Sequence, residues 1–76
     1  MKNTLKTNGV YGAKIGNKIA FTREGAINIF KTFVEVCYNN ITIESSYVLS
    51  EVSQDMHRIG FSFEELEQLE LEVISA

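Results

Sequence analysis

The chain has 76 residues, of which 45% are hydrophobic and 22% are charged, and its formal net charge at pH 7 is −3. A chain of this length forms one domain, spanning residues 1–76, whose core is small because it buries only about 60% of the surface that the unfolded form exposes. The composition is typical of a globular protein, and no apolar run approaches the roughly 20 residues of a transmembrane helix, so we expect no contact with a membrane.

Residues 1–21 predict a β-hairpin or a three-stranded meander. Asn8-Gly9 lies between apolar and β-branched residues, and this dipeptide favours a two-residue hairpin turn because both residue types tolerate positive φ. It predicts antiparallel strands at residues 3–7 and 10–15.

A second turn at Gly16 predicts a third strand at residues 18–21. A two-residue loop would pair Ile15 with Lys18, which mixes apolar and charged side chains on one face of the sheet. A three-residue loop pairs Ile15 with Ile19 instead. We therefore expect the three-residue loop and its register.

Residues 22–38 predict the central helix of the domain. Thr22 can cap its N-terminus, Glu24 lies in the first turn where the helix dipole favours an anion, and Asn39-Asn40 supply a left-handed stop. At about 100° per residue the apolar side chains sweep an arc of roughly 200°, wider than the stripe of a surface helix. Other elements of the chain, or a second copy of it, must therefore cover this helix from more than one direction. The arc contains Ala26, Ile27, Ile29, Phe30, Phe33, Val34, Val36, Cys37 and Tyr38.

Residues 46–75 predict two helices joined by a short turn, which is the layout of a helix-turn-helix. The first of the two runs from Ser46 to Ile59 and has a narrow apolar stripe on one side. Gly60 follows directly and is the expected C-terminal stop, because glycine adopts the left-handed conformation without strain.

Four residues mark the start of the last helix. Ser62 and Glu65 match a capping box, in which each side chain accepts a hydrogen bond from the backbone amide of the other residue. Phe61 and Leu66 are placed as the accompanying hydrophobic staple. We expect this helix to continue to residue 75, although alternating apolar residues from position 69 onward leave a C-terminal strand as the alternative. The elements together predict an α+β fold.

Few residues could support catalysis or metal binding. Cys37 and His57 are the only candidates for a nucleophile and its base, but Cys37 lies within the apolar arc, where a thiol behaves as a small hydrophobic group. One His and one Cys cannot complete a metal site, and the glycines match neither a dinucleotide-binding motif nor a P-loop. We therefore predict no enzymatic activity, no metal and no cofactor.

The single cysteine also bears on the cellular compartment. Cys37 cannot form a disulfide within the chain, whereas small secreted domains commonly depend on several disulfides. The lysines at the start of the chain are not followed by the hydrophobic stretch of an export signal. We therefore expect a cytoplasmic protein.

Charge is distributed unevenly along the chain. Residues 1–38 carry six Lys and Arg against two Glu, whereas residues 39–76 carry one Arg against eight acidic residues. Basic and acidic surfaces of this kind attract each other within a fold, and each can also steer a partner of opposite charge. The uneven charge therefore has two interpretations. Either the basic and acidic halves pair with each other within the fold (the internal interpretation), or one of them binds an oppositely charged partner (the intermolecular interpretation).

The basic N-terminal segment raises the hypothesis of a small DNA- or RNA-binding regulator. Lys6, Lys14 and Lys18 could contact phosphates, and Tyr11 could stack on a base. The last helix, by contrast, carries five Glu and no Lys or Arg, so a phosphate backbone would repel it. Nucleic acid is therefore the less favoured partner.

The leading hypothesis is a non-enzymatic protein-binding module whose acidic last helix meets a basic surface on a partner protein. Such a helix can occupy the nucleic-acid-binding groove of another protein, as small phage-type inhibitors do. The wide apolar arc also favours a homodimer, and an accessory subunit of a larger complex is a further alternative. The predicted contact residues are Glu64, Glu65, Glu67, Glu70 and Glu72.

Overall fold

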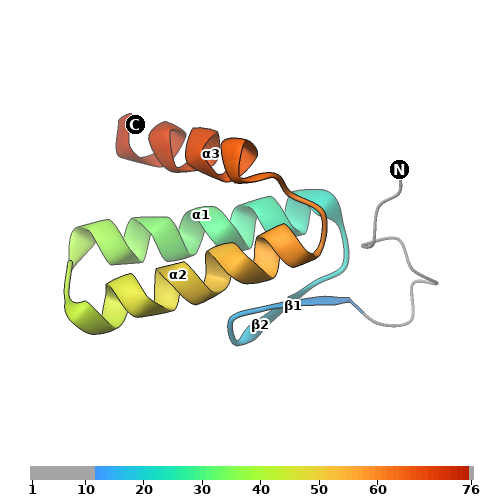
Figure 1. The fold of residues 1–76 in the computed structure, drawn as a ribbon, viewed down its shortest axis with the longest axis horizontal. Helices are drawn as coiled ribbons and strands as arrows, with labels where there is room; N and C mark the ends of the chain where they lie inside the picture. Colours follow the sequence, from blue (N-terminus) through green and yellow to red (C-terminus); the bar gives the residue numbers. More distant parts are fainter. Residues whose placement is uncertain (1–11, 76) are drawn as a thin grey trace.

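The computed structural model describes residues 12–75, which form a two-stranded antiparallel hairpin followed by three helices (Figure 1). This arrangement confirms the predicted α+β fold. The turn expected at Asn8-Gly9 and the strand expected at residues 3–7 lie outside the described residues. The elements are β1 (Ala13–Ile15), β2 (Lys18–Ala20), α1 (Arg23–Asn39), α2 (Ile43–Arg58) and α3 (Phe63–Ser75).

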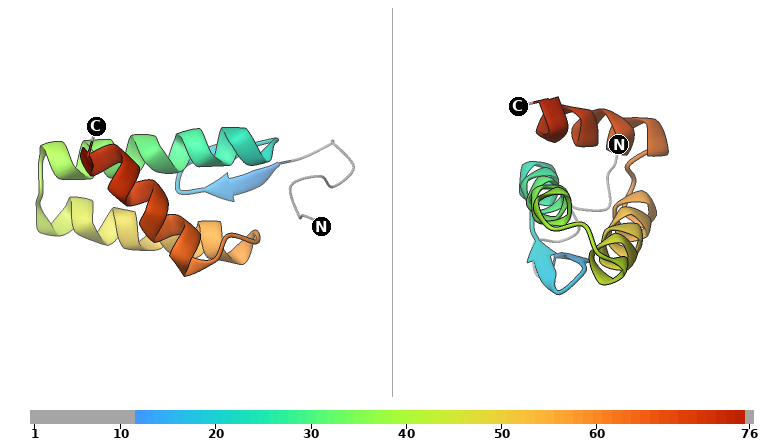
Figure 2. Two further views of the ribbon diagram at one scale, coloured as in Figure 1. Left: turned by 90° about the horizontal axis from the view of Figure 1, so that it is seen from above. Right: turned by 90° about the vertical axis from the view of Figure 1, so that its left-hand side faces the viewer.

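The elements are arranged in three layers (Figure 2). Helices α1 and α2 lie antiparallel in the middle layer, α3 crosses them diagonally on one side, and the hairpin packs on the opposite side. Helix α1 contacts both strands and both other helices. It is therefore the central helix that its wide apolar arc predicts.

The core forms where the three layers meet along α1. Phe30 and Val34 are fully buried there, and Val52, Met56 and Phe61 pack against them. Of the predicted arc, Val36 and Tyr38 alone are classed as exposed, so other elements of the same chain cover the rest. The width of the arc therefore requires no second copy of the chain.

The register expected for the hairpin is wrong. Ile15 pairs with Lys18 across a two-residue turn, and Lys14 pairs with Ile19. Gly16 adopts φ +61°, as the first central residue of a type II′ turn does. Its amide donates a hydrogen bond of 2.9 Å to Asp55 Oδ2 on α2, so a contact with a distant helix fixes the turn. Ile15 is buried, while Lys18 remains in solvent at the tip of the hairpin.

The connection between α1 and α2 also differs from the expected one. Helix α2 begins at Ile43 rather than Ser46, because Thr42 and Ser45 form a capping box with hydrogen bonds of 2.9 and 3.0 Å. Asn40 has φ −150° rather than the expected left-handed conformation. An extended backbone at this residue lets the short connection reach the cap of α2.

The turn between α2 and α3 confirms the sequence signals. Gly60 has φ +121°, and Ser62 and Glu65 exchange capping-box hydrogen bonds of 2.9 and 3.1 Å. Both staple residues, Phe61 and Leu66, are buried.

Helix α3 continues to Ser75, so the alternative of a C-terminal strand is wrong. Leu69 and Val73, at helical spacing from the buried Leu66, pack against the core. A strand would direct consecutive residues to opposite sides and would lose these contacts.

Candidate functional site

The acidic residues of α3 divide between two sides of the helix. Glu65 and Glu72 are seven residues apart and lie on the side that faces α1. Glu65 Oε2 is 2.8 Å from Arg23 Nη2, and Glu72 Oε1 is 2.9 Å from Lys31 Nζ. These ion pairs join the basic and acidic halves of the chain, so the internal interpretation of the charge polarity is correct for these two glutamates.

Several contacts hold Glu65 in its place. Besides Arg23, its carboxylate accepts the amide hydrogen of Ser62 at 2.9 Å, and this hydrogen bond is the main cause that lowers the pKa of Glu65. The Arg23 guanidinium in turn lies 4.2 Å above the centre of the Phe61 ring. Glu65 therefore has its partners within the fold.

Glu64, Glu67 and Glu70 lie on the other side of α3, away from Arg23 and Lys31. Within residues 12–75, none of these three carboxylates has a Lys, Arg or His nitrogen within ion-pair distance. They therefore form the part of the predicted contact set whose charge is not neutralised within the described fold.

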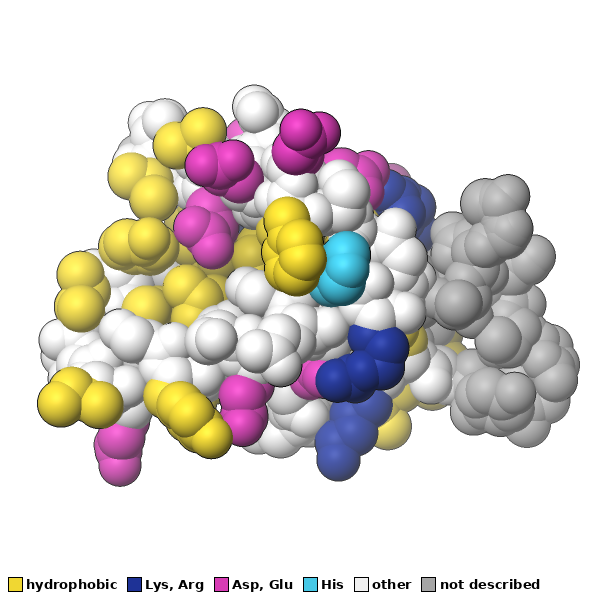
Figure 3. Space-filling model, viewed as in Figure 1, with side chains coloured by type: hydrophobic (Ala, Val, Ile, Leu, Met, Phe, Trp, Pro, Cys, Tyr) yellow, Lys and Arg dark blue, Asp and Glu magenta, His cyan; other side chains and the backbone are white. Residues whose placement is uncertain are grey.

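Large apolar side chains interleave with these three glutamates. Phe63, Leu71 and Ile74 are 58%, 51% and 50% exposed, although residues of this kind normally pack inward on a short helix. Figure 3 shows hydrophobic and acidic side chains mixed along the upper edge of the molecule, where α3 runs. We call this surface, formed by Phe63, Glu64, Glu67, Glu70, Leu71 and Ile74, the outward face of α3.

A groove lies beside the outward face, between α3 and the N-terminal half of α2. It has a volume of about 380 Å³, and Glu70 lines it from α3. Leu49, Ser50 and Ser53 line it from α2, and Tyr38 lines it from α1. Hydrophobic side chains lie recessed between the two helices in Figure 3. The groove exists because α3 crosses the α1–α2 pair diagonally and leaves part of their seam uncovered (Figure 2).

Glu70 stands at the edge of this groove. Partial burial raises the pKa of its carboxyl group, and the negative charge of Glu67 raises it further. Both effects disfavour the ionised form of Glu70. A cation placed in the groove would therefore stabilise the ionised form of Glu70.

His57 and Phe63 form the corner at which α3 begins. Their rings stack with centroids 4.0 Å apart at an interplanar angle of 17°. His57 Nδ1 is 2.9 Å from the carbonyl oxygen of Phe61, and it donates this hydrogen bond in the tautomer that carries the proton on Nδ1. The stack holds Phe63 at one end of the outward face.

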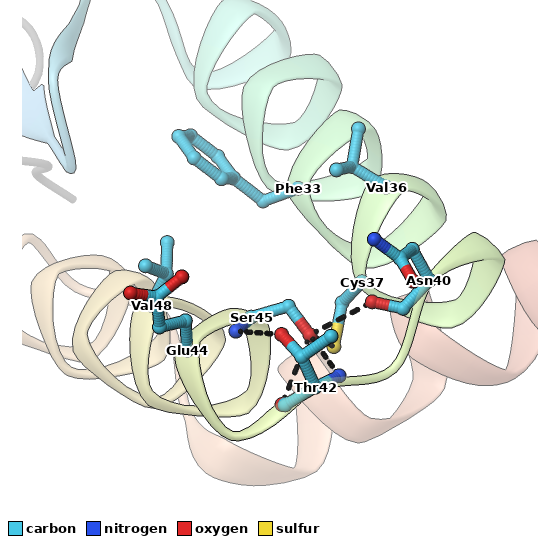
Figure 4. Close-up of a pocket in the computed structure, with 8 residues that line it drawn as sticks. All are labelled: Phe33, Val36, Cys37, Asn40, Thr42, Glu44, Ser45 and Val48. Atoms are coloured by element: carbon cyan, nitrogen blue, oxygen red, sulfur yellow. Dashed lines mark hydrogen bonds between the residues drawn. The ribbon is translucent and has the colours of Figure 1, made fainter.

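Cys37 and His57 are far apart. Cys37 is buried, and its thiol donates to Ser45 Oγ at 3.7 Å in the first turn of α2 (Figure 4). His57 lies twelve residues further along the same helix, a distance of about 18 Å along the axis. They cannot act together as a nucleophile and base.

The cavity beside Cys37 has a volume of about 320 Å³ and is drawn in Figure 4. The Ser45 hydroxyl on its wall lies 3.1 Å from the carbonyl oxygens of Asn40 and Thr42 and accepts the Thr42 amide hydrogen at 2.9 Å. This hydroxyl already serves the cap of α2. It is therefore not a free polar group that could orient a ligand in this cavity.

The basic residues predicted to contact nucleic acid are only partly described. Lys6 and Tyr11 lie outside the described residues, while Lys14 and Lys18 are exposed on β1 and β2. The cavity of about 440 Å³ beside Lys14 is also lined by Arg58 and by the carboxylates of Glu51 and Asp55. A phosphate entering this cavity would meet two carboxylates as well as the two cations.

Within residues 12–75, no three His, Cys, Asp or Glu side chains converge on a point that could hold a metal ion. None of the helices formed by these residues is long and apolar enough to cross a bilayer.

Comparison with known proteins finds no family model, no curated protein and no solved structure that matches this chain.

Proposed function

We propose that the chain is a non-enzymatic protein-binding module that contacts a basic surface of a partner protein through the outward face of α3. The observation that carries this proposal is the interleaving of Glu64, Glu67 and Glu70, unpaired within residues 12–75, with three half-exposed apolar side chains. The remaining two predicted contact residues, Glu65 and Glu72, hold α3 on α1 instead.

The apolar residues supply the affinity in this proposal. Scattered exposed hydrophobic residues are normal on a protein surface, but Phe63, Leu71 and Ile74 lie on one side of a single short helix. Burying the exposed half of Phe63 would remove about 100 Å² from water, which is worth about 2.5 kcal/mol. Aromatic side chains such as Phe63 commonly dominate the energy of an interface.

The glutamates supply selection of the partner. A negative surface accelerates association with a basic protein and repels nucleic acid and acidic proteins, and both effects weaken with salt. We propose that the basic surface is one with which the partner binds nucleic acid, so that the module acts as an inhibitor. The support for this step is the acidic character of the outward face.

A pull-down tests the proposal. The tagged chain is incubated with host lysate, with and without nuclease, beside a variant carrying Glu64→Gln, Glu67→Gln and Glu70→Gln. The matched control carries Glu35→Gln, Glu44→Gln and Glu51→Gln, which changes the net charge equally at three exposed sites on α1 and α2.

We expect a protein that survives nuclease and is captured by the wild type and the control but not by the α3 variant. Equal loss from both variants would show that net charge alone governs capture. Capture of nucleic acid alone would favour the regulator that uses Lys14 and Lys18.

A further inference from the structure

We propose that the groove between α2 and α3 receives a basic amphipathic helix of the partner protein. This inference rests on the proposed function, because it names the element of the partner that meets the acidic side of α3. It uses Glu67 and Glu70 of the outward face, together with the seam of α1 and α2 that α3 leaves uncovered.

The walls of the groove favour a helical occupant. Both walls are helices, and a helix has no free row of backbone amides and carbonyls with which an extended peptide could pair. An occupant must therefore bind through its side chains, and a helix can project these into the groove from successive turns.

The serines of α2 give the groove its depth. Ser46, Ser50 and Ser53 recur at spacings of four and three residues and line the groove on one side of the helix. Their short side chains leave space over a length of about 10 Å, or two helical turns. Tyr38, Ile41 and Leu49 add apolar lining. A partner helix could insert apolar side chains from two successive turns.

The charges define which helix fits. Acidic groups border the groove on the α3 side, where Glu70 lines it and Glu67 is close enough to raise the pKa of Glu70. The occupant must therefore carry an apolar stripe with Lys or Arg along its flank, which is the pattern of a basic amphipathic helix.

A second copy of the chain does not offer such a helix within residues 12–75. The cations of the described helices, Arg23, Lys31 and Arg58, are each already paired with a carboxylate of the same chain. Charge complementarity thus favours a different protein over self-association at this groove.

Two labelled peptides test the inference. Both peptides have the same numbers of leucine and lysine residues and a length of about 15 residues, which is long enough for a marginally stable helix. One places its leucines at helical spacing and the other alternates leucine with lysine, as in a strand. Fluorescence anisotropy measures the affinity of each for the full chain.

We expect the helical-period peptide to bind at least about tenfold more tightly than its isomer. Ser50→Trp, which fills the groove at an exposed position, should abolish this preference. Ser50→Lys, which opposes a basic peptide, should do the same and serves as the second variant. Gln54→Trp, which lies on the side of α2 toward Lys14, is the matched control and should bind as the wild type does.

Equal affinity for the two peptides, or unchanged preference in both Ser50 variants, would overturn the groove inference. The pull-down distinguishes this failure from failure of the proposed function. If the partner is still lost with the α3 glutamine variant but is retained by Ser50→Trp, the outward face binds a partner without the groove.

Discussion

The hydrogen bond between Gly16 and Asp55 should contribute strongly to the stability of the fold, because it anchors the hairpin to α2. The Asp55 carboxylate accepts the Gly16 amide at 2.9 Å through Oδ2 and pairs with Arg58 at 2.8 Å through Oδ1. A hydrogen bond to a charged group contributes about 1.5 to 3 kcal/mol, so Asp55→Ala should lower the free energy of unfolding by that amount. The whole free energy of unfolding of a chain of 76 residues is about 4 to 11 kcal/mol, so this hydrogen bond is a large part of it.

Urea denaturation measures this loss. With an m-value of about 1 kcal/mol per M, the midpoint for Asp55→Ala should fall by about 1.5 to 3 M. Asp55→Asn keeps an acceptor for the amide and should lose less. Arg58→Ala removes only the ion pair of a side chain that is 69% exposed, and its midpoint should fall by less than about 0.5 M. If Arg58→Ala destabilises the chain as much as Asp55→Ala does, the ion pair and not the hairpin anchor is the important contact.

Three further predictions concern α3 and its turn. Phe61→Ala should lower the free energy of unfolding by about 3 to 5 kcal/mol, because Phe61 is 1% exposed. Phe63→Ala should change the free energy of unfolding by less than about 1 kcal/mol, because Phe63 is 58% exposed. Similar urea midpoints for the two variants would contradict the assigned burial. The pKa of Glu65 is lowered in the fold. The ionised Glu65 carboxylate therefore contributes to stability at a pH above its unfolded pKa of 4.5, and this contribution is lost as the pH falls through its lower folded pKa. Glu65→Gln should reduce the acid sensitivity of the urea midpoint. The pKa of Glu70 is raised in the fold, so ionisation of Glu70 is less favourable in the folded than in the unfolded chain and lowers the stability at a pH above the folded pKa. Glu70→Gln should therefore raise the urea midpoint at pH 7 but not below the unfolded value of 4.5. An unchanged pH profile in both variants would refute these assignments.

The elements that the sequence predicted correctly are those with local signals. Thr22 accepts the Gly25 amide as an N-cap, and Ser62 and Glu65 form the expected box, because these contacts join residues only three apart. The start of α2 was missed since its box uses Ser45, whereas the usual motif has Glu or Gln at that position.

The hairpin register could not be predicted from local pattern. The contact that fixes Gly16 comes from Asp55, 39 residues away, and it outweighs the mixing of Ile15 with Lys18 on one face. Nothing in the spacing of charges near the turn identifies that partner, because the contact depends on the packing of α2 beside the hairpin.

The candidate site was predicted in part. The five glutamates of α3 are evident in the sequence, but their division depends on which side of the helix meets Arg23 and Lys31. Phe63 stands three residues before the buried Leu66, yet it is exposed on the outward face. A helical projection that separated Glu65 and Glu72 from the other three would have identified the second stripe, which contains Phe63, Leu71 and Ile74.

The charge arrangement of α3 also bears on the order in which the domain opens and closes. Glu64, Glu67 and Glu70 repel one another at spacings of three residues, and the last turn has no basic side chain to complement the helix dipole. Helix α3 therefore depends on its contacts with α1 to remain helical, and it should detach in local opening events before α1 and α2 separate. A protein bound to the outward face of α3 would stabilise the docked helix and make its detachment from α1 less frequent. The affinity for that protein and the stability of the docked helix would therefore rise or fall together.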